Sequence, residues 1–298
     1  MNQLQDRVKE AMAATGLSQN ALAKKIGMSS AVVSQWMASK YPGNIKSLEA
    51  RVQAVMDAEA DKASVRRFQA PFVSTSVSVG VYDMANLAQR DGEICVATGD
   101  AGIGKTRAVK EYVVDNPTAI LIEVDPSTNA QVLLVKLHSA LGLNSSGTMA
   151  QQVSDIVEKL TGSDRLVILD EAEYLSVKAL EFIRRIHDHS YVGILLVGMP
   201  RLIENIRGRK RDFAQLYSRV GGYTKLEGIP VEEAASIVEA YYPDGVDVAR
   251  LASVFYKAAR GNVRTMAKLI VRVMRICEKR KLEPDADLIA EVSKMLIV

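Results

Sequence analysis

The segment GDAGIGKT at residues 99–106 constrains the fold of this 298-residue chain more than any other feature of its sequence. It follows an apolar run, EICVAT, and precedes RAVKEYVV, which has the apolar spacing of a helix. Gly99, Gly102 and Gly104 let the backbone point several N–H groups at one anion, and the start of a helix adds the positive end of its dipole. Strand, glycine-rich turn and helix in this order predict a phosphate-binding P-loop in an α/β fold.

The polar side chains of this loop define the expected ligands. Lys105 would place its ammonium group against the β- and γ-phosphates, and the hydroxyl of Thr106 is suited to ligate Mg²⁺. We therefore predict ATP and Mg²⁺ as cofactors. The predicted nucleotide-binding residues of the loop are Gly99, Asp100, Ala101, Gly102, Ile103, Gly104, Lys105 and Thr106.

A second apolar run, RLVIL, ends in two carboxylates, Asp170 and Glu171. Open parallel sheets bind ligands at the carboxyl ends of their strands, so both side chains are expected beside the P-loop. Asp170 is predicted to hold Mg²⁺ through water, and Glu171 to orient the attacking water as general base. With Lys105, these two carboxylates form the core of the predicted catalytic set.

Strands alternate with helical patterns over residues 71–228, which is the sequence signature of a parallel sheet with crossover helices. Short and almost wholly apolar runs predict strands that are covered on both faces. From Pro230 onward the pattern is helical. The strand candidates are Glu93–Thr98, Ala119–Val124, Leu166–Leu169, Gly193–Val197 and Tyr223–Glu227. The predicted organisation is a helix-turn-helix domain at 1–56, a linker or frayed helix end at 57–70, an α/β core at 71–228 and a helical domain at 229–298.

The stretch LSQNALAKKIGMSSAVVSQWMASKYPG, residues 17–43, predicts a helix-turn-helix, with Gly27 in the turn and Ser29 or Ser30 capping the second helix. Such a module can read DNA or dock a protein, and both interpretations stay open. For the DNA interpretation, small polar residues would enter the major groove and lysines would meet phosphates. The predicted contacts are Lys24, Lys25, Ser30, Ser34 and Gln35.

Basic side chains gather in two further segments, although the net charge of the whole chain is only +3. One is the loop IRGRKRDF. The other is a C-terminal helical segment in which basic residues recur every three or four positions, so that they share one helix face. Both segments predict contact with nucleic acid, the alternative being surface or subunit contacts. The residues concerned are Arg207, Arg209, Lys210 and Arg211 in the loop, and Arg264, Lys268, Arg272, Arg275 and Lys279 in the helix.

Composition adds two expectations. No apolar run reaches the roughly 18 residues that a membrane-spanning helix needs. Only Cys95 and Cys277 are present, which indicates no disulfide framework and favours a cytoplasmic location.

The order of P-loop, DE strand, further strand and helical tail resembles the AAA+ family of ATPases. This resemblance implies a C-terminal helical lid and an arginine that reaches the γ-phosphate in a neighbouring subunit. In FAQLYSR that arginine is Arg219, with Arg211 as the second candidate. In the segment GNVR, Arg264 would contact the nucleotide within its own chain. Met199 stands where the family usually has a polar γ-phosphate sensor, so slow or partner-dependent hydrolysis is expected.

Within that family, the chain resembles the transposition B proteins of Mu-type bacteriophages, through the N-terminal module ending in KYPG and the runs APFVSTSVSVGVYDMANLA, LVILDEAEYL and GILLVGMPR. The resemblance implies an ATPase of the bacterial host cell that binds double-stranded DNA with little sequence preference. It also implies ATP-dependent homo-oligomers or helical filaments, recruitment of a transposase, and an adenine site bordered by residues 72–82. A helicase-loader-type replication ATPase and a non-DNA AAA+ ATPase with a protein-docking N-terminal module are the alternatives.

Overall fold

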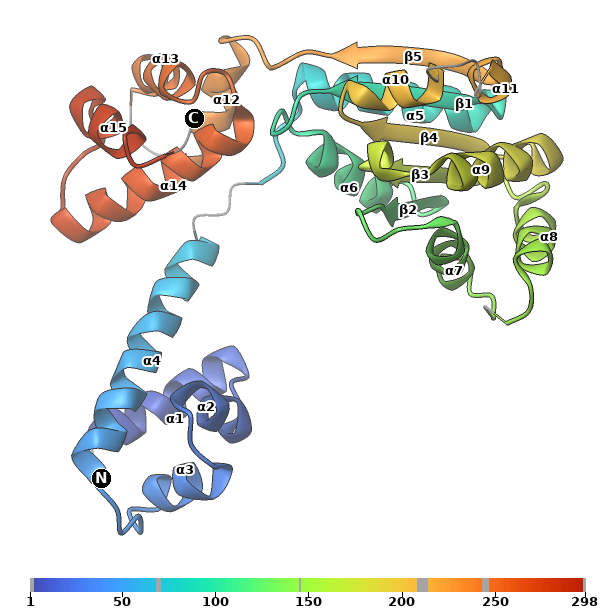
Figure 1. The fold of residues 1–298 in the computed structure, drawn as a ribbon. Helices are drawn as coiled ribbons and strands as arrows, with labels where there is room; N and C mark the ends of the chain where they lie inside the picture. Colours follow the sequence, from blue (N-terminus) through green and yellow to red (C-terminus); the bar gives the residue numbers. More distant parts are fainter. Residues whose placement is uncertain (1–2, 68–70, 145, 208–213, 243–246, 297–298) are drawn as a thin grey trace. The chain divides into compact units, whose positions relative to one another are not determined.

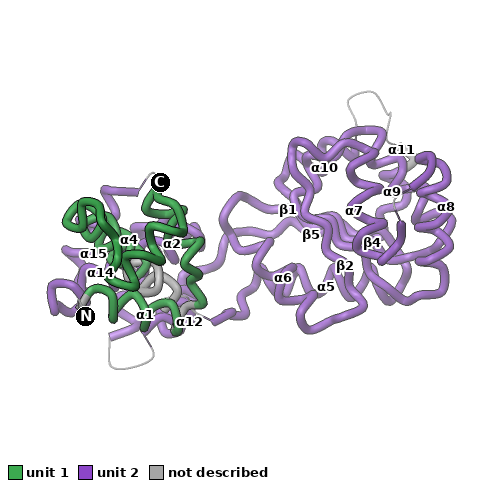
Figure 2. Tube along the Cα trace, turned by 90° about the horizontal axis from the view of Figure 1, so that it is seen from below, with its two compact units in different colours: residues 1–69 green, residues 70–298 purple. Residues whose placement is uncertain are grey.

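The computed structural model describes residues 3–67, 71–144, 146–207, 214–242 and 247–296. By their internal contacts these residues form two compact units, residues 1–69 and residues 70–298 (Figure 2).

The first unit consists of helices, and two of them are joined by a tight turn. Gly27 ends α2 in the left-handed conformation (φ 69°), and Ser29 begins α3 by accepting a hydrogen bond from the backbone N–H of Val32. Trp36 is buried at the centre of this unit, and its backbone carbonyl accepts a hydrogen bond from the side chain of Gln5. The helices are α1 (Gln3–Thr15), α2 (Gln19–Ile26), α3 (Ser30–Met37) and α4 (Ile45–Arg67).

Helix α4 continues through most of the segment that we predicted as a linker or frayed helix end, residues 57–70. The sequence DAEADKASVRR contains neither glycine nor proline, and most of its residues cost an α-helix little. The low apolar content of this segment is therefore compatible with a helix as far as Arg67. The division of the chain into functional domains stays a prediction.

The second unit is built on one parallel five-stranded sheet in the order β2-β3-β4-β1-β5 (Figure 1). Strand β1 lies between β4 and β5, with Ala97 opposite Val197 and Thr224. The P-loop therefore leaves the sheet from an interior strand. The strands are β1 (Ile94–Gly99), β2 (Ala119–Glu123), β3 (Leu166–Asp170), β4 (Gly193–Gly198) and β5 (Val220–Leu226).

Successive side chains of the inner strands point to opposite faces of the sheet, and both faces are covered. Cys95 and Ala97 pack in one hydrophobic cluster, whereas Ile94 and Val96 pack in another. This double coverage explains why these strands have continuous apolar sequences. The first face is covered by α5 (Ser76–Asp91) and α6 (Lys105–Asp115). The second is covered by α7 (Ala130–Ala140), α8 (Met149–Leu160), α9 (Val177–Ser190), α10 (Arg201–Arg207) and α11 (Ala214–Tyr217).

Strand β5 begins at Val220, three residues before the predicted start at Tyr223. Gly221 and Gly222 have low strand propensity and no apolar side chain to reveal them. Gly222 nevertheless pairs with Cys95 of β1, and Gly221 is the extra residue where the register between the two strands shifts.

Four helices follow the sheet and share the hydrophobic cluster of its first face. Phe255 of α13 and Ile270 of α14 are fully buried in this cluster. The helices are α12 (Glu233–Tyr241), α13 (Val248–Ala258), α14 (Val263–Arg280) and α15 (Ala286–Ser293).

Candidate nucleotide site

The P-loop connects the end of β1 to the start of α6 and adopts backbone conformations that favour glycine. Gly102 has a φ of 83° and Gly104 has a φ of 114°, both outside the range that other residues adopt readily. Gly104 immediately precedes the first turn of α6, so the free N–H groups of that turn open onto the same space as the loop. This is a ready-made anion site.

Lys105 is buried at the first position of α6, with its ammonium group turned back onto the loop. Its Nζ donates hydrogen bonds to the carbonyl oxygens of Gly99, at 2.7 Å, and Asp100, at 2.8 Å. Burial lowers the pKa of Lys105, and the nearby carboxylates of Glu173 and Asp170 partly oppose that effect. Gly99 and Asp100 do not line the cavity described below, and their carbonyl groups hold the lysine side chain.

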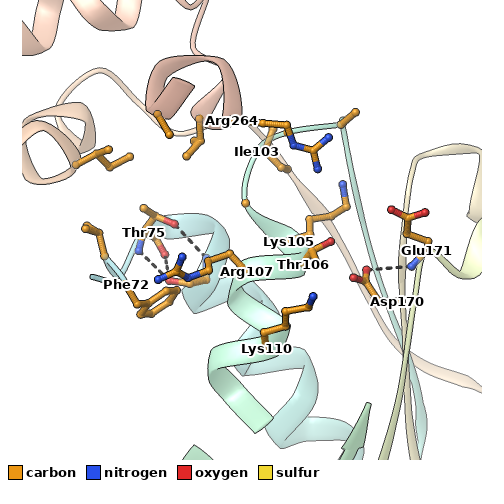
Figure 3. A pocket seen from close by; sticks show the side chains of 18 of the residues that line it. Phe72, Thr75, Ile103, Lys105, Thr106, Arg107, Lys110, Asp170, Glu171 and Arg264 are labelled. Atoms are coloured by element: carbon orange, nitrogen blue, oxygen red, sulfur yellow. Dashed lines mark hydrogen bonds between the residues drawn. The ribbon is translucent and has the colours of Figure 1, made fainter. Parts of the chain in front are cut away.

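Asp170 and Glu171 lie at the carboxyl end of β3 and face the loop (Figure 3). Asp170 is only 2% exposed, and burial raises its pKa, against the opposing effect of hydrogen bonds from Thr106 and the Glu171 N–H. Glu171 is exposed and has a φ of 54°, an uncommon conformation for a residue with a side chain. The backbone thus bends sharply where the second carboxylate enters the site.

Glu173 is a third carboxylate in the site, and no sequence motif indicated it. It lies in a short 3₁₀ helix (Ala172–Tyr174), is 7% exposed and lines the same cavity. Its Oε2 accepts a hydrogen bond from the backbone N–H of Met199 at 3.2 Å, and Oε1 lies 3.8 Å from a guanidinium nitrogen of Arg201. A carboxylate therefore occupies the end of β4, where Met199 supplies no polar side chain.

These residues surround a cavity of about 590 Å³, a volume that suits a small-molecule ligand. Phe72, Val73 and Thr75 line the cavity as well, whereas Tyr82 does not; that residues 72–82 border an adenine stays a prediction. Arg107 and Lys110 also line the cavity and were missed. Lys110 follows Thr106 by four residues, a spacing that places both side chains on one helix face and could have revealed it.

Arg264 belongs to α14 and lines the same cavity (Figure 3). Its backbone N–H donates a hydrogen bond to the carbonyl of Gly102 at 2.9 Å. The structure therefore brings together Lys105, Thr106, Asp170, Glu171 and Arg264, as the sequence predicted.

Arg219 does not line the cavity of its own chain. It lies just before β5, is 46% exposed and is paired with Asp188 of α9. Arg211, the second candidate for the same role, lies outside the described residues.

The basic residues of α14 lie opposite its buried side, which is formed by Met266, Leu269, Ile270, Val273 and Cys277. Lys268, Arg272 and Lys279 are exposed. Arg275 differs: it is half-buried, and its Nε has no hydrogen-bond partner among the described residues.

Of the other predicted DNA contacts, some are exposed, some contact another side chain of the protein, and some lie outside the described residues. Lys24, Ser30, Ser34 and Gln35 are exposed on α2 and α3. Lys25 forms an ion pair with Glu59 at 2.7 Å, and the guanidinium of Arg207 lies 5.8 Å from the ring centre of Tyr217. Arg209, Lys210 and Arg211 lie outside the described residues.

The strand order, the P-loop and the two carboxylates at the end of β3 agree with the AAA+ fold that the sequence predicted. Consistent with this, residues 88–206 match the family model described as an AAA domain. The matched segment contains β1 to β4, with the P-loop and both carboxylates.

Over most of its length the chain is also similar to Mu-type transposition B proteins, as the sequence resemblance indicated. It is 26% identical over 246 residues to the Mu-like prophage FluMu DNA transposition protein B of Haemophilus influenzae, covering 79% of this chain and 84% of that protein. It is 28% identical over 232 residues to the ATP-dependent target DNA activator B of Escherichia phage Mu, covering 75% of this chain and 73% of that protein.

Solved structures share the fold at low sequence identity. The ORC2 protein of Aeropyrum pernix in its ADP form aligns with a TM-score of 0.60 and 16% identity, covering 78% of this chain and 72% of that one. Domain III of the Thermotoga maritima replication initiation protein DnaA aligns with a TM-score of 0.51 and 16% identity, covering 76% and 94%. Among the described residues, no helix is both long enough and apolar enough to span a membrane.

Proposed function

We propose that this chain is an ATP-switched DNA-binding ATPase that assembles on target DNA with little sequence preference and recruits and activates a transposase. The observation that carries the proposal is one helix, α14, which presents Arg264 to the cavity at its start and exposes Lys268, Arg272 and Lys279 along its length. The name of the phage Mu relative, ATP-dependent target DNA activator B, supports the same assignment.

In the proposed site the chain's own residues bind and orient the triphosphate. Lys105 exchanges its two carbonyl partners for phosphate oxygens, and the N–H groups at the start of α6 supply further donors. Glu171 holds the attacking water and accepts its proton. Arg264 contacts the phosphates from the same chain, while Arg219 of a neighbouring copy completes the site.

Thr106 and Asp170 would hold Mg²⁺, which neutralises charge on the β- and γ-phosphates when bound. Asp170 fits this role because it is a buried carboxylate whose pKa is raised mainly by loss of solvent. Two protein oxygens suit a cation that keeps several waters and takes its remaining ligands from phosphates.

The first unit would act as an accessory DNA-binding module. Helix α3 follows the tight turn after α2, as a recognition helix does, and it exposes Ser30, Ser34 and Gln35. Lys24 would add a phosphate contact. If the module is an accessory, deleting residues 1–56 should cost less affinity per charge removed than loss of the basic residues of the second unit.

Electron microscopy with long duplex DNA of random sequence tests the proposal. ATP-dependent filaments or rings on the DNA are expected with the wild type and not with Lys105→Ala. Complete absence of DNA binding with ATP would favour a protein-docking ATPase. Binding that requires only residues 1–56 and one sequence would favour a sequence-specific regulator.

The salt dependence of binding provides a quantitative check. Removing one side chain that binds a phosphate should flatten the slope of log K against log salt by about 0.9 on duplex DNA. Lys268→Ala and Arg272→Ala together should therefore flatten it similarly on unrelated sequences. The second test replaces Arg207, Arg209 and Lys210 together by alanine and measures the same slope.

A further inference from the structure

Asn262 joins the P-loop to helix α14 through both ends of its side-chain amide. Its Oδ1 accepts a hydrogen bond from the backbone N–H of Thr265 at 3.0 Å and so caps the helix. Its Nδ2 donates to the carbonyl oxygen of Ala101 at 2.8 Å. The Arg264 N–H binds the next carbonyl, that of Gly102, at 2.9 Å. Two consecutive P-loop carbonyls are thus held by the first turn of α14.

The contact is close enough to depend on glycine in the loop. A Cβ atom added at Gly102 would lie 2.6 Å from the side-chain nitrogen and oxygen of Asn262. Because both of these atoms are engaged in hydrogen bonds, the amide cannot withdraw without losing them. The glycine therefore serves the approach of Asn262 as well as the loop conformation.

Peptide geometry turns this contact into control of the phosphate donors. A trans peptide is planar, so its C=O and N–H point in opposite directions. Holding the Ala101 carbonyl fixes the direction of the Gly102 N–H, and holding the Gly102 carbonyl fixes that of the Ile103 N–H. These N–H groups belong to the loop that would bind phosphate. If nucleotide binding rotates their peptides, the carbonyl groups turn as well, and the hydrogen bonds to α14 must stretch or move the helix.

The residue type supports this assignment. Asp, Ser and Thr cap helices about as well as Asn does, because capping requires only an acceptor. Of these side chains, only the amide adds a nitrogen donor that can reach a second carbonyl while its oxygen still caps. In Asn262 this nitrogen donates its hydrogen bond to the P-loop carbonyl of Ala101.

We propose that Asn262 is a positioning residue that couples the nucleotide state of the P-loop to the position of α14. The inference rests on the proposed ATP site, but it does not depend on α14 binding DNA. Through Asn262, the presence or loss of the γ-phosphate would change the position of the helix that carries Arg264 and the exposed basic residues.

Asn262→Asp keeps the cap and removes the donor, but it also adds a negative charge beside the loop. Asn262→Ser keeps a cap, loses the contact with Ala101 and adds no charge, so both variants are measured. We expect near-normal thermal stability with ATP·Mg²⁺ affinity lowered about three- to tenfold, the effect of losing one hydrogen bond. Asn129 provides a matched control. It caps α7 with the same 3.0 Å geometry and does not line the cavity, so Asn129→Ala and Asn129→Asp should leave nucleotide affinity unchanged.

Hydrogen exchange gives a readout that a purely structural role would not change. In the wild type, saturating ATP should slow exchange in the P-loop and in the first turn of α14 together. In Asn262→Asp, ATP concentrations that saturate the variant should protect the loop while the response in α14 is lost. If Asn262→Asp does not fold, Asn262→Ser alone is measured, since serine also caps but does not reach Ala101.

Two results would overturn the inference while leaving the ATP site intact: wild-type α14 that does not respond to bound ATP, or Asn262→Asp with unchanged affinity and an unchanged α14 response. Failure of the wild type to bind ATP in a Lys105-dependent manner would instead overturn the proposed site itself.

Discussion

The guanidinium Nε of Arg219 lies 2.9 Å from Oδ1 of Asp188 in the same chain. Arg184 binds the same carboxylate, so Asp188 joins two arginines at the end of α9. Burial acts to raise the pKa of Asp188, but the hydrogen bond and charge of Arg219 and the charge of Arg184 outweigh it, and the pKa lies below its ordinary value. Arg219 is therefore held at the surface of its own chain.

If Arg219 completes the site of a neighbouring subunit, Arg219→Ala should keep ATP binding and lose turnover by on the order of 10³-fold or more. Asp188→Ala is the matched control, because it breaks the same ion pair and keeps the guanidinium. We expect Asp188→Ala to retain ATPase activity. Equal loss in both variants would mean that Arg219 serves only to hold α9.

Mixing the variants tests whether the arginine acts between subunits. Arg219→Ala and Lys105→Ala chains should each be inactive alone, yet regain ATPase activity when combined, because each supplies what the other lacks. The measurement is phosphate release as a function of mixing ratio. No recovery at any ratio would show that Arg219 does not act in trans.

Glu171→Gln should bind ATP and fail to hydrolyse it, since the amide keeps the shape of the side chain and cannot accept the proton. Loss of a general base lowers turnover by about 10²–10⁴-fold. Thermal shift with ATP·Mg²⁺ reports binding, and about 2.7 kcal/mol of stabilisation is expected at a ligand concentration 100 times Kd. If Glu171→Gln hydrolysed ATP at the wild-type rate, the general base would have to be another residue.

Asp170→Asn should stabilise the nucleotide-free protein, because it removes a charge that burial disfavours. The raised pKa means that the carboxylate costs stability above that pKa, and that the cost falls as the pH drops below it. We expect a gain of about 0.5–2 kcal/mol near neutral pH, with loss of Mg²⁺-dependent ATP binding. The stabilisation should shrink in urea titrations at lower pH.

Glu173 allows its charge and its hydrogen bond to be tested separately. Glu173→Gln keeps an acceptor for the Met199 N–H and removes a negative charge close to the phosphate site, so ATP affinity should rise. Glu173→Ala leaves that part-buried N–H without its partner and should lower stability by about 1 kcal/mol. Calorimetry of ATP binding and urea unfolding of both variants distinguish the two effects.

Local sequence patterns predicted most of the nucleotide site, because its chemistry resides in short segments. The P-loop needs glycines, a lysine and a hydroxyl in fixed order, and the buried strand before Asp170 is visible as an apolar run. Each of these two patterns is contained in a few consecutive residues. The β1–β4 strands were therefore located to within a residue or two.

Other features depend on contacts between distant segments, which one sequence does not reveal. Glu173 is an ordinary acidic residue in DEAEYL until β4 places Met199 against it. The pairing of Arg219 with Asp188 spans 31 positions. Gly222 joins a strand because Cys95 of β1 offers it a backbone partner.

The close packing of Gly198 against Glu173 limits how the site can diverge. A methyl group at position 198 would collide with the Glu173 carboxylate, which is buried and bonded to the neighbouring N–H of Met199. Neither position can therefore mutate freely while the other is unchanged. Alanine or serine at 198 meets this clash while Glu173 is unchanged, and shortening residue 173 alone leaves the Met199 N–H without its acceptor, so either single change lowers stability. The two positions should consequently exchange residue types as a pair among relatives of this chain.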